Sequence, residues 1–320
     1  MFETPVLLNI FTRIESTVKV FEIIKHIKPR HFFIAADGPR DGNIHDMENC
    51  AKVRKYVLEN IDWDCKVETL FRDRNLGCGL APFNAMNWFF NNVEEGIILE
   101  DDCVPSLSFF NYCRELLEKY RYNENIYVIG GNNFQGKKRS NASYYFSAYG
   151  HTWGWATWRR AWKNYIYDTS TISEKEFVRA LNNYFSTDRE KVYWLGVFNM
   201  MKNHHSNDIW DYQWTFSQWL NNAVNIVPNV NLVKNIGFDE FATHTKWETP
   251  GVSNLHAHDI SVIKHPKRIK INRKADLYTI NFIYDPIYNK NTKSSGFLKK
   301  IILSIIRYFG YDLVKINKRK

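Results

Sequence analysis

Apolar runs alternate with amphipathic stretches over residues 5–134. Short apolar runs that end at turn residues predict buried strands, and apolar residues at helical spacing predict helices. The predicted strands are 5–13, 31–42, 65–73, 96–102 and 126–134, and the predicted helices are 15–29, 47–61, 80–93 and 106–121. Strands that alternate with helices indicate an α/β fold, in which a mostly parallel sheet carries helices on both faces.

Charged residues follow four of the predicted strands. Arg13 follows the first strand, Asp37 the second, Asp73 and Arg74 the third, and residues 100–102 the fourth. Sheets of this kind bind ligands at the carboxyl ends of their strands. Because four strand ends carry charge, we expect a binding site at this edge of the sheet.

Three adjacent acids, Glu100, Asp101 and Asp102, end the fourth strand in the stretch GIILEDDCVP. Carboxylate oxygens are preferred ligands of Mg²⁺ and Mn²⁺, which often share their ligands with a diphosphate. The alternative is a solvated acidic turn, because short acidic clusters are common. Neither a dinucleotide-binding fingerprint after the first strand nor a Walker A sequence is present, so NAD and P-loop chemistry are not predicted.

The composition limits the class of protein. Of 320 residues, 44% are apolar and 24% charged, as in globular proteins. The five scattered cysteines include no C-x-x-C pair, which predicts reduced thiols in the cytoplasm. No secretory signal and no run of about 20 apolar residues is recognisable. The net charge of +9 is concentrated in the tail, so a nucleic-acid partner is not predicted.

Four segments together resemble the GT-A nucleotide-sugar glycosyltransferases, in particular the branch typified by N-acetylglucosaminyltransferase I and its bacterial relatives. The segments are LNIFTR, IAADGP, RNLGCG and IILEDDCVPSLSFF. That family carries an E-D-D form of the D-x-D motif, which EDDCVPSLSFF matches. HTWGWATWRRAW and IWDYQW are similar to its Gly-Trp and W-D-D-W segments, although Tyr212 and Gln213 depart from the second. The resemblance covers roughly residues 5 to 250.

The resemblance implies roles for the residues that match its motifs. Asp102 would be the direct metal ligand and Asp211 the catalytic base. Contacts to the nucleotide sugar would come from Arg13, Asp37, Arg74, Glu100 and Asp101. Acceptor contacts would come from Trp153, Gly154 and Trp155, and His244 would be a second metal ligand.

The activity that the resemblance implies is a metal-dependent, inverting transfer of a hexosyl or N-acetylhexosaminyl group. Mn²⁺ or Mg²⁺ would serve as cofactor, a UDP-sugar as donor, and a glycan or lipid-linked molecule as acceptor, as in polysaccharide biosynthesis. A sugar nucleotidylyltransferase is an alternative, but that class needs a glycine-rich basic loop after the first strand, and FTRIEST lacks one. A carbohydrate-binding protein with an inactive site is the other alternative.

Three of these residue assignments have a structural alternative. Asp211 lies among Trp210, Tyr212 and Trp214, whose rings would desolvate a base, but Asp is also a favoured helix N-cap before YQWTFSQWL. A lone histidine such as His244 is more often structural. The spacing of Trp155, Trp158 and Trp162 fits a helix packed in the core. For HTWGWATWRRAW we expect acceptor contact and core packing together, with Gly154 near the ligand and Trp158 and Trp162 in the core.

The predicted domain plan is one GT-A catalytic domain, residues 1–288, with a nucleotide-binding half at about 1–135 and an acceptor half at about 136–288. Residues 289–320 form a linker and a basic helical tail. From Gly296 onward the tail carries seven Lys and Arg against one Asp. An amphipathic basic helix on an anionic membrane is predicted, on the inner face of the cell membrane. The alternative is a C-terminal helix packed on the domain.

Overall fold

The computed structural model describes residues 1–204, 209–238 and 254–284. The predicted metal ligand His244 and the predicted linker and tail, residues 289–320, lie outside the described residues. Within the described ranges, no helix has both the length and the apolar character needed to cross a bilayer.

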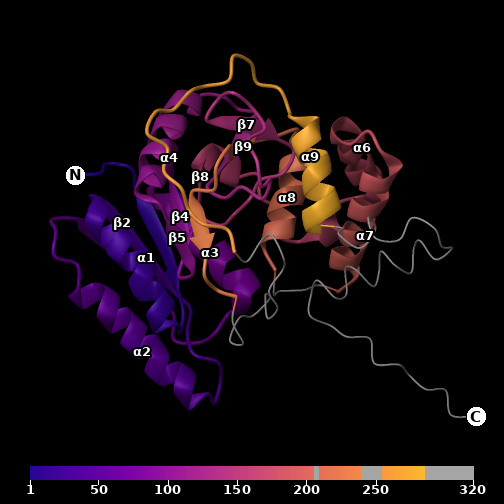
Figure 1. The fold of residues 1–320 in the computed structure, drawn as a ribbon. Coiled ribbons are helices and arrows are strands. Elements are labelled where there is room, and N and C mark those ends of the chain that lie inside the picture. The colour runs from indigo at the N-terminus through magenta and orange to yellow at the C-terminus, as the bar shows by residue number, and fades with distance from the viewer. Residues whose placement is uncertain (205–208, 239–253, 285–320) are drawn as a thin grey trace, which may run out of the picture.

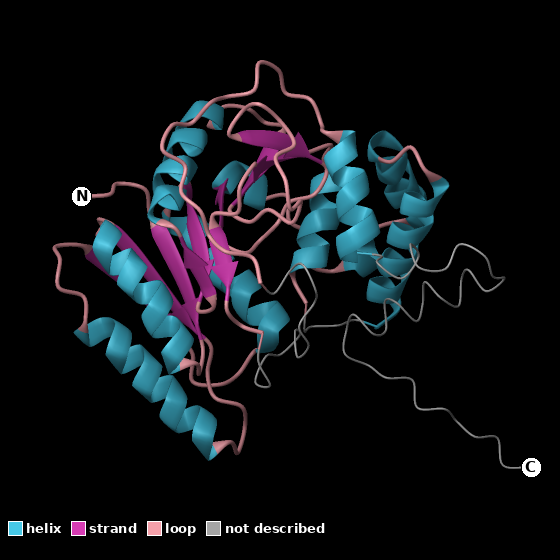
Figure 2. Ribbon diagram, viewed as in Figure 1, coloured by secondary structure: helices cyan, strands magenta, loops and turns pink. Residues whose placement is uncertain are grey.

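An eight-stranded sheet forms the centre of this structure, in the order β3-β2-β1-β4-β8-β6-β9-β7 (Figures 1 and 2). The strands are, in that order, Lys66–Phe71, His31–Ala36, Val6–Ile10, Glu95–Glu100, Trp155–Trp158, Ile126–Gly130, Val224–Pro228 and Tyr144–Ser147. Strands β3, β2, β1 and β4 run parallel, and so do β6 and β9, whereas β8 and β7 are antiparallel to their neighbours. The predicted mixed, mostly parallel α/β sheet is confirmed.

Helices cover both faces of the sheet because successive side chains of its strands point in opposite directions. Val6 and Leu8 of β1 pack in one core cluster with side chains of α1 (Ile14–Ile27), α2 (Ile44–Glu59) and α4 (Leu107–Tyr120). Leu7 packs in another, with side chains of α3 (Gly77–Asn92), α5 (Arg159–Trp162) and α8 (Asp211–Leu220). The sheet is therefore buried on both sides.

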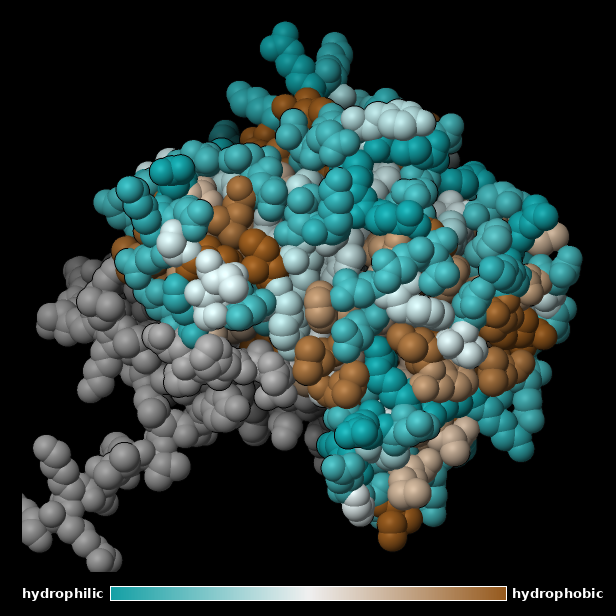
Figure 3. Space-filling view, turned by 180° about the vertical axis from the view of Figure 1, so that it is seen from behind, coloured by the Kyte–Doolittle hydropathy of each residue, from teal (hydrophilic) through white to brown (hydrophobic). Residues whose placement is uncertain are grey.

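A further core cluster joins α8 to α6 (Glu174–Tyr184) and α7 (Asp188–His204). Figure 1 shows these helices at the end of the molecule opposite α1 and α2. The face seen from behind in Figure 3 is mainly hydrophilic, and its hydrophobic side chains form separate patches. Many of the chain's aromatic side chains are buried in these three clusters.

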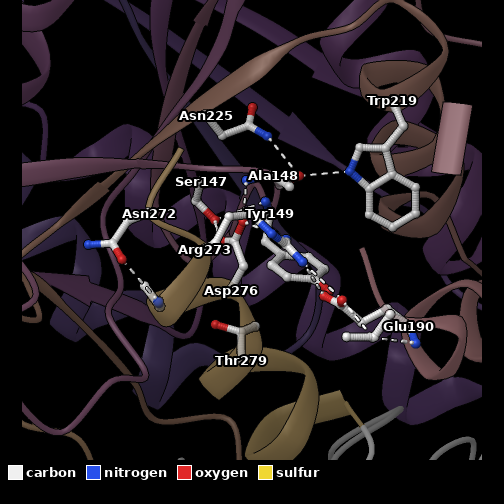
Figure 4. A network of polar contacts seen from close by, with 12 residues as sticks. Ser147, Ala148, Tyr149, Glu190, Trp219, Asn225, Asn272, Arg273, Asp276 and Thr279 are labelled. Atoms are coloured by element: carbon white, nitrogen blue, oxygen red, sulfur yellow. Dashed lines mark hydrogen bonds and ion pairs between the residues drawn. The ribbon is translucent and has the colours of Figure 1, made fainter. Parts of the chain in front are cut away.

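A buried polar network fastens α9 (Arg273–Thr279) to the rest of the fold (Figure 4). The carboxylate of Asp276 accepts hydrogen bonds from Ser147 Oγ at 2.6 Å and from the Ala148 backbone N–H at 3.2 Å. Arg273 Nη1 lies 3.3 Å from Asp276 Oδ2, and its Nη2 donates to both oxygens of Glu190 at 2.9 Å. The network links α9 to β7 and α7.

The nine elements predicted over residues 5–134 are all present, with ends shifted by a few residues. The predicted strand 31–42 ends at Ala36, because Asp37, Gly38 and Pro39 turn the chain. The helical spacing of Trp155, Trp158 and Trp162 predicted a helix, and this was wrong. Residues 155–158 pair with β4 and β6 as strand β8, and only residues 159–162 are helical.

A two-stranded antiparallel sheet lies beside the carboxyl end of β4. It consists of β5 (Cys103–Pro105) and β10 (Val233–Asn235). Beyond β10, the Ile236 backbone N–H donates to the carbonyl oxygen of Asp102 at 2.9 Å. This pairing carries the chain after β10 across the acidic residues.

Candidate active site

The acidic cluster, Glu100, Asp101 and Asp102, meets Arg13 at the edge of the sheet. Strands β1 and β4 are parallel neighbours, and Asn9 pairs with Glu100 in their register. Both strands therefore end at the same level, with Arg13 in the short turn from β1 to α1. Arg13 Nη2 donates to Asp101 Oδ1, and it donates to Asp102 Oδ2 at 2.9 Å.

Two of the three acids are buried, and the acidic cluster holds more negative than positive charge. Asp101 is 4% exposed and Asp102 is 9% exposed. Burial raises the pKa of Asp101 to about 6, with Arg13 opposing and Asp102 adding to the rise. The pKa of Glu100 is raised to about 8, and burial is the largest cause. The negative charges of Asp102, Asp101 and Asp211 raise it further. One guanidinium thus faces carboxyl groups that repel one another, which is the environment that a cation would stabilise.

The donor atoms of this cluster fit a hard divalent cation. Ligand atoms of Glu100, Asp102 and Cys103 all lie within 4.8 Å of one another. Asp101 Oδ2 is buried and has no hydrogen-bond partner among the residues that the structure describes. Burial keeps the pKa of the Cys103 thiol well above its ordinary value, and its Sγ donates to Asp102 Oδ1 at 3.3 Å. The carboxylates therefore fit Mg²⁺ or Mn²⁺, whereas Cys103 is a neutral hydrogen-bond donor.

Gly237 closes one side of the cluster, and the sequence analysis missed it. A methyl group at this position would collide with the carboxylate of Asp102 and would lie 2.9 Å from Arg13 Nη1. The Gly237 backbone N–H is held by Asn235 Oδ1 at 2.7 Å. Only a residue without a side chain fits so close to the Arg13–Asp102 pair. The glycine in NIGFDE, shortly after strand β10, was the available signal.

Asp211 lies at the first residue of α8, and the N-cap position is occupied by Trp210. Asp211 Oδ1 accepts from the Tyr212 backbone N–H at 3.0 Å, so the predicted alternative of an N-cap does not describe it. Its charge is close enough to Glu100 and to Tyr165 to raise the pKa of each, although burial is the larger cause in both. The fold thus brings Asp211 to the acidic cluster from a distant part of the chain.

Two of the three predicted acceptor residues belong to the core. Trp155 has no exposed surface, and its ring stacks on Trp210 with centroids 5.8 Å apart. Gly154 has a φ of 62°, and a methyl group there would lie 2.8 Å from Val233 Cγ2, so its lack of a side chain serves packing. Trp155 has no surface on which an acceptor could lie, because β8 is a buried central strand, so its assignment was wrong. Gly154 directly precedes that strand, and its contact with an acceptor stays a prediction. Trp158 and Trp162 are buried, as predicted.

Trp153 is partly exposed, unlike the two other residues predicted to contact the acceptor. Its ring has edge contacts with Phe134 at 5.1 Å and with Phe238 at 5.6 Å between centroids. Phe238 follows Gly237 directly, so this aromatic group borders the acidic cluster. Its role in acceptor binding stays a prediction.

Asp37 organises the turn that enters α3. Its carboxylate accepts from the backbone N–H groups of Gly38, Leu76 and Gly77, and from Asn75 Nδ2 at 2.9 Å. Burial raises the pKa of Asp37, and these backbone hydrogen bonds lower it. Arg74 lies in the same turn, with an exposed side chain. The predicted contacts of Asp37 and Arg74 with a nucleotide stay predictions, and the observed role of Asp37 is to hold the RNLGCG segment.

Two asparagines with buried side-chain amide atoms were also missed. Asn9 lies opposite Glu100 on β1, and its Oδ1 is buried. Asn132 follows β6 and has no exposed surface. In the part of the chain that the structure describes, neither Asn9 Oδ1 nor the amide of Asn132 has a hydrogen-bond partner. A polar residue within the apolar run VLLNIF was the signal for Asn9.

Comparisons with known proteins give partial likenesses in fold. No family model and no curated protein matches the chain. HddC from Yersinia pseudotuberculosis matches with a TM-score of 0.31 and 10% identity, over 49% of this chain and 77% of that chain. The 4-diphosphocytidyl-2C-methyl-D-erythritol synthase from Anaerococcus prevotii matches with a TM-score of 0.33 and 10% identity, over 60% and 84%. A UDP-glucose pyrophosphorylase in complex with UDP-glucose matches with a TM-score of 0.26 and 12% identity, over 46% and 62%. At these TM-scores the likenesses do not decide the function.

Proposed function

We propose that this protein is a metal-dependent transferase that uses a nucleotide sugar, and that it transfers the sugar to a hydroxyl group of an acceptor. The observation that carries the proposal is the convergence of Asp211 with the acidic cluster and Arg13. The cluster is suited to a cation and a diphosphate. A separate carboxylate beside it is suited to accept a proton. Sugar transfer by single displacement needs both.

The acidic cluster and Arg13 would bind the donor. Asp102 and Glu100 would hold Mn²⁺ or Mg²⁺, which would neutralise the charge that develops on the departing nucleoside diphosphate. Asp101 is fixed by Arg13 and would orient the sugar or ribose. Asp37 and Arg74 would contact the nucleotide from the neighbouring turn. The cluster would thus supply binding and orientation at the leaving-group side of the sugar.

Asp211 would be the general base. An acceptor hydroxyl has a pKa far above 7, so it must lose its proton to a nearby base as it attacks. Attack from the side opposite the leaving group would invert the anomeric centre. Trp153, with Phe134 and Phe238 around it, would support the acceptor sugar by stacking. We propose a UDP-sugar donor, carrying a hexose or N-acetylhexosamine, and a glycan or lipid-linked acceptor.

Sugar nucleotidyl transfer is the second candidate. The names of the synthase and the pyrophosphorylase among the similar structures point to this reaction rather than to glycosyl transfer. The turn after β1 argues against it, because only Phe11, Thr12 and Arg13 separate β1 from α1. A glycine-rich phosphate-binding loop does not fit in three such residues. The test must therefore distinguish the two reactions.

The distinguishing experiment compares products. The protein is incubated with Mn²⁺ and a panel of UDP-sugars, with and without glycan acceptors, and released UDP is measured. In parallel it is incubated with UTP and sugar 1-phosphates, and released pyrophosphate is measured. Acceptor-dependent UDP release supports glycosyl transfer, and pyrophosphate release supports nucleotidyl transfer. Binding of a UDP-sugar without either product would indicate a carbohydrate-binding protein.

We also propose that the tail, residues 296–320, contacts the inner face of the cell membrane. The support is its sequence, with seven cationic residues beside apolar residues at helical spacing. Such a contact would place a cytoplasmic enzyme beside a lipid-linked acceptor.

A further inference from the structure

We infer that Arg13 is an internal counter-ion that competes with a divalent cation for Asp102 and that transfers to the diphosphate when the nucleotide binds. Metal and nucleotide would then bind cooperatively, each weakly alone and tightly together. This inference rests on the proposed nucleotide-sugar site and specifies how that site is loaded.

The backbone of Arg13 is fixed, whereas its side chain is partly exposed. Its carbonyl oxygen accepts from the Thr17 backbone N–H at 3.0 Å and from Thr17 Oγ1 at 2.7 Å, in the first turn of α1. The side chain of Arg13 is 29% exposed. A change of rotamer could therefore release the guanidinium from the acids without moving β1 or α1.

Asp102 Oδ2 is the atom for which the two cations would compete. The other oxygen, Oδ1, accepts from the Cys103 thiol, and Oδ2 accepts from Arg13 Nη2 at 2.9 Å. Mg²⁺ binds oxygen ligands at about 2.0–2.1 Å, so such an ion would occupy the space in which the guanidinium now lies. Two cations that close together also repel each other strongly at a site shielded from water.

Gly237 prevents the two cations from lying side by side. Its backbone is so close to Asp102 and Arg13 that even a methyl group would collide with the carboxylate. The Ile236 backbone N–H donates to the Asp102 carbonyl, which holds this segment in place. With one side of Asp102 closed in this way, entry of a metal ion requires Arg13 to leave.

A diphosphate offers Arg13 a new partner. The planar guanidinium forms paired, charge-assisted hydrogen bonds with phosphate as readily as with carboxylate. Loss of the pair with Asp102 would then be offset only when the nucleotide is present. By thermodynamic linkage, the nucleotide would raise metal affinity by the same factor by which the metal raises nucleotide affinity.

The experiment measures Mn²⁺ binding to the full chain by titration calorimetry, with and without saturating UDP. The variant is R13Q, which removes the charge but keeps a polar side chain of similar reach. The matched control is R121Q, which breaks the exposed Arg121–Glu95 pair at the other end of β4. In the absence of UDP, we expect R13Q to bind Mn²⁺ at least about tenfold more tightly than wild type does. A hydrogen bond to a charged group contributes roughly 1.5–3 kcal/mol, and 1.4 kcal/mol corresponds to a tenfold change in affinity. UDP should tighten Mn²⁺ binding at least about tenfold in wild type and R121Q, and less than about threefold in R13Q.

Equal or weaker binding of Mn²⁺ by folded R13Q than by wild type would overturn the inference, as would an unchanged effect of UDP. If R13Q does not fold, R13K takes its place. Lysine keeps the charge but lacks the planar fork, so it should bind Mn²⁺ alone more tightly than wild type does, and failure to do so would also overturn the inference. Absence of Mn²⁺ binding in every variant would overturn the inference and the metal-dependent function together. If R13Q behaves as predicted but no sugar is transferred, the counter-ion role stands and the proposed reaction is wrong.

Discussion

Arg13 Nη2 lies 2.9 Å from Asp102 Oδ2, although the two residues are 89 positions apart in the chain. The contact exists because β1 and β4 are parallel neighbours that end at the same level. The contact joins the turn after β1 to the acidic residues at the carboxyl end of β4. Gly237, from after β10, closes over the contact, and Asp211 approaches Glu100 from α8. Four distant segments thus build one polar site.

Replacement of Asp102 should remove metal-dependent binding without unfolding the protein. In D102A, Arg13 keeps its pair with Asp101, so the variant should melt within a few degrees of wild type. A ligand at about 100 times its Kd stabilises a protein by roughly 2.7 kcal/mol. Thermal shift with UDP-sugar and Mn²⁺ should show this stabilisation in wild type and lose it in D102A. An equal shift in both proteins would show that Asp102 does not bind the metal.

Replacement of Asp211 by asparagine should separate binding from chemistry. Asparagine keeps the shape of the side chain but cannot accept the acceptor's proton, so turnover should fall by about 10²–10⁴. UDP-sugar affinity should stay within about threefold, because the donor groups lie in the acidic cluster. D168N, the same change at the exposed cap of a short helical turn, is the control and should keep its turnover. Turnover of D211N within a few-fold of D168N would exclude Asp211 as the base.

More of the fold than of the site could be predicted from the sequence. The sequence over residues 5–134 was sufficient to predict the parallel sheet, because the spacing of apolar residues in each segment indicates either a strand or a helix. Trp155 was misassigned because tryptophans at positions 155, 158 and 162 have helical spacing by chance, and pairing with Ile98 of β4 decided its conformation. A single sequence does not indicate which strands become central.

The acidic cluster could be predicted, but its partners could not. Three adjacent acids after an apolar run are visible in the sequence, whereas Gly237 is important only because tertiary folding places it beside Asp102. Asp37 was expected at the ligand, and the sequence did not show that its carboxylate accepts hydrogen bonds from the backbone of Leu76 and Gly77. Long-range contacts of this kind depend on the register of the sheet, which the pattern of residues does not specify.

Addition of one methyl group at Gly237 should damage the site. In G237A the new Cβ would collide with the Asp102 carboxylate and approach Arg13 Nη1, so either the pair or the backbone must move. We expect Mn²⁺-dependent UDP binding to weaken at least about tenfold, which corresponds to 1.4 kcal/mol. G136A is the control, since a methyl group there meets open space although its φ of 63° makes alanine unfavourable. G136A should therefore lose some stability and keep its UDP affinity, and equal binding by both variants would contradict the prediction.

Deletion of residues 296–320 should release the protein from anionic vesicles. The attraction of a basic helix to anionic lipid is electrostatic, so binding of the full chain should weaken as salt is raised. Sedimentation with vesicles that contain phosphatidylserine measures this, and neutral phosphatidylcholine vesicles are the control. Turnover of a soluble acceptor should be unchanged. A shortened protein that aggregates or melts at a lower temperature would instead indicate that the tail packs on the domain.

The buried carboxyl of Asp276 should make stability depend on pH. Burial raises its pKa to about 6 from an ordinary 3.8, against the opposing effects of Ser147, Ala148 and Arg273. The folded state therefore binds more protons than the unfolded state between these values. The contribution of Asp276 to stability is fully present below pH 3.8 and is lost as the pH rises through 6. Asparagine imitates the protonated acid and cannot ionise. The unfolding free energy of D276N, relative to wild type, should thus rise by roughly 2 kcal/mol between pH 4 and 7.5.

The measurement is urea unfolding at pH 4, 5, 6 and 7.5, because the difference between the two proteins cancels all other titrating groups. S147A provides a variant with the opposite effect. It removes the hydroxyl that donates to Asp276 Oδ1 at 2.6 Å, which favours the ionised form. Its loss should raise the pKa of Asp276 further, so S147A should lose more stability than wild type over the same pH range. If the free energy of unfolding depends on pH in the same way for wild type, D276N and S147A, ionisation of Asp276 does not destabilise the network of Figure 4, and the prediction is wrong.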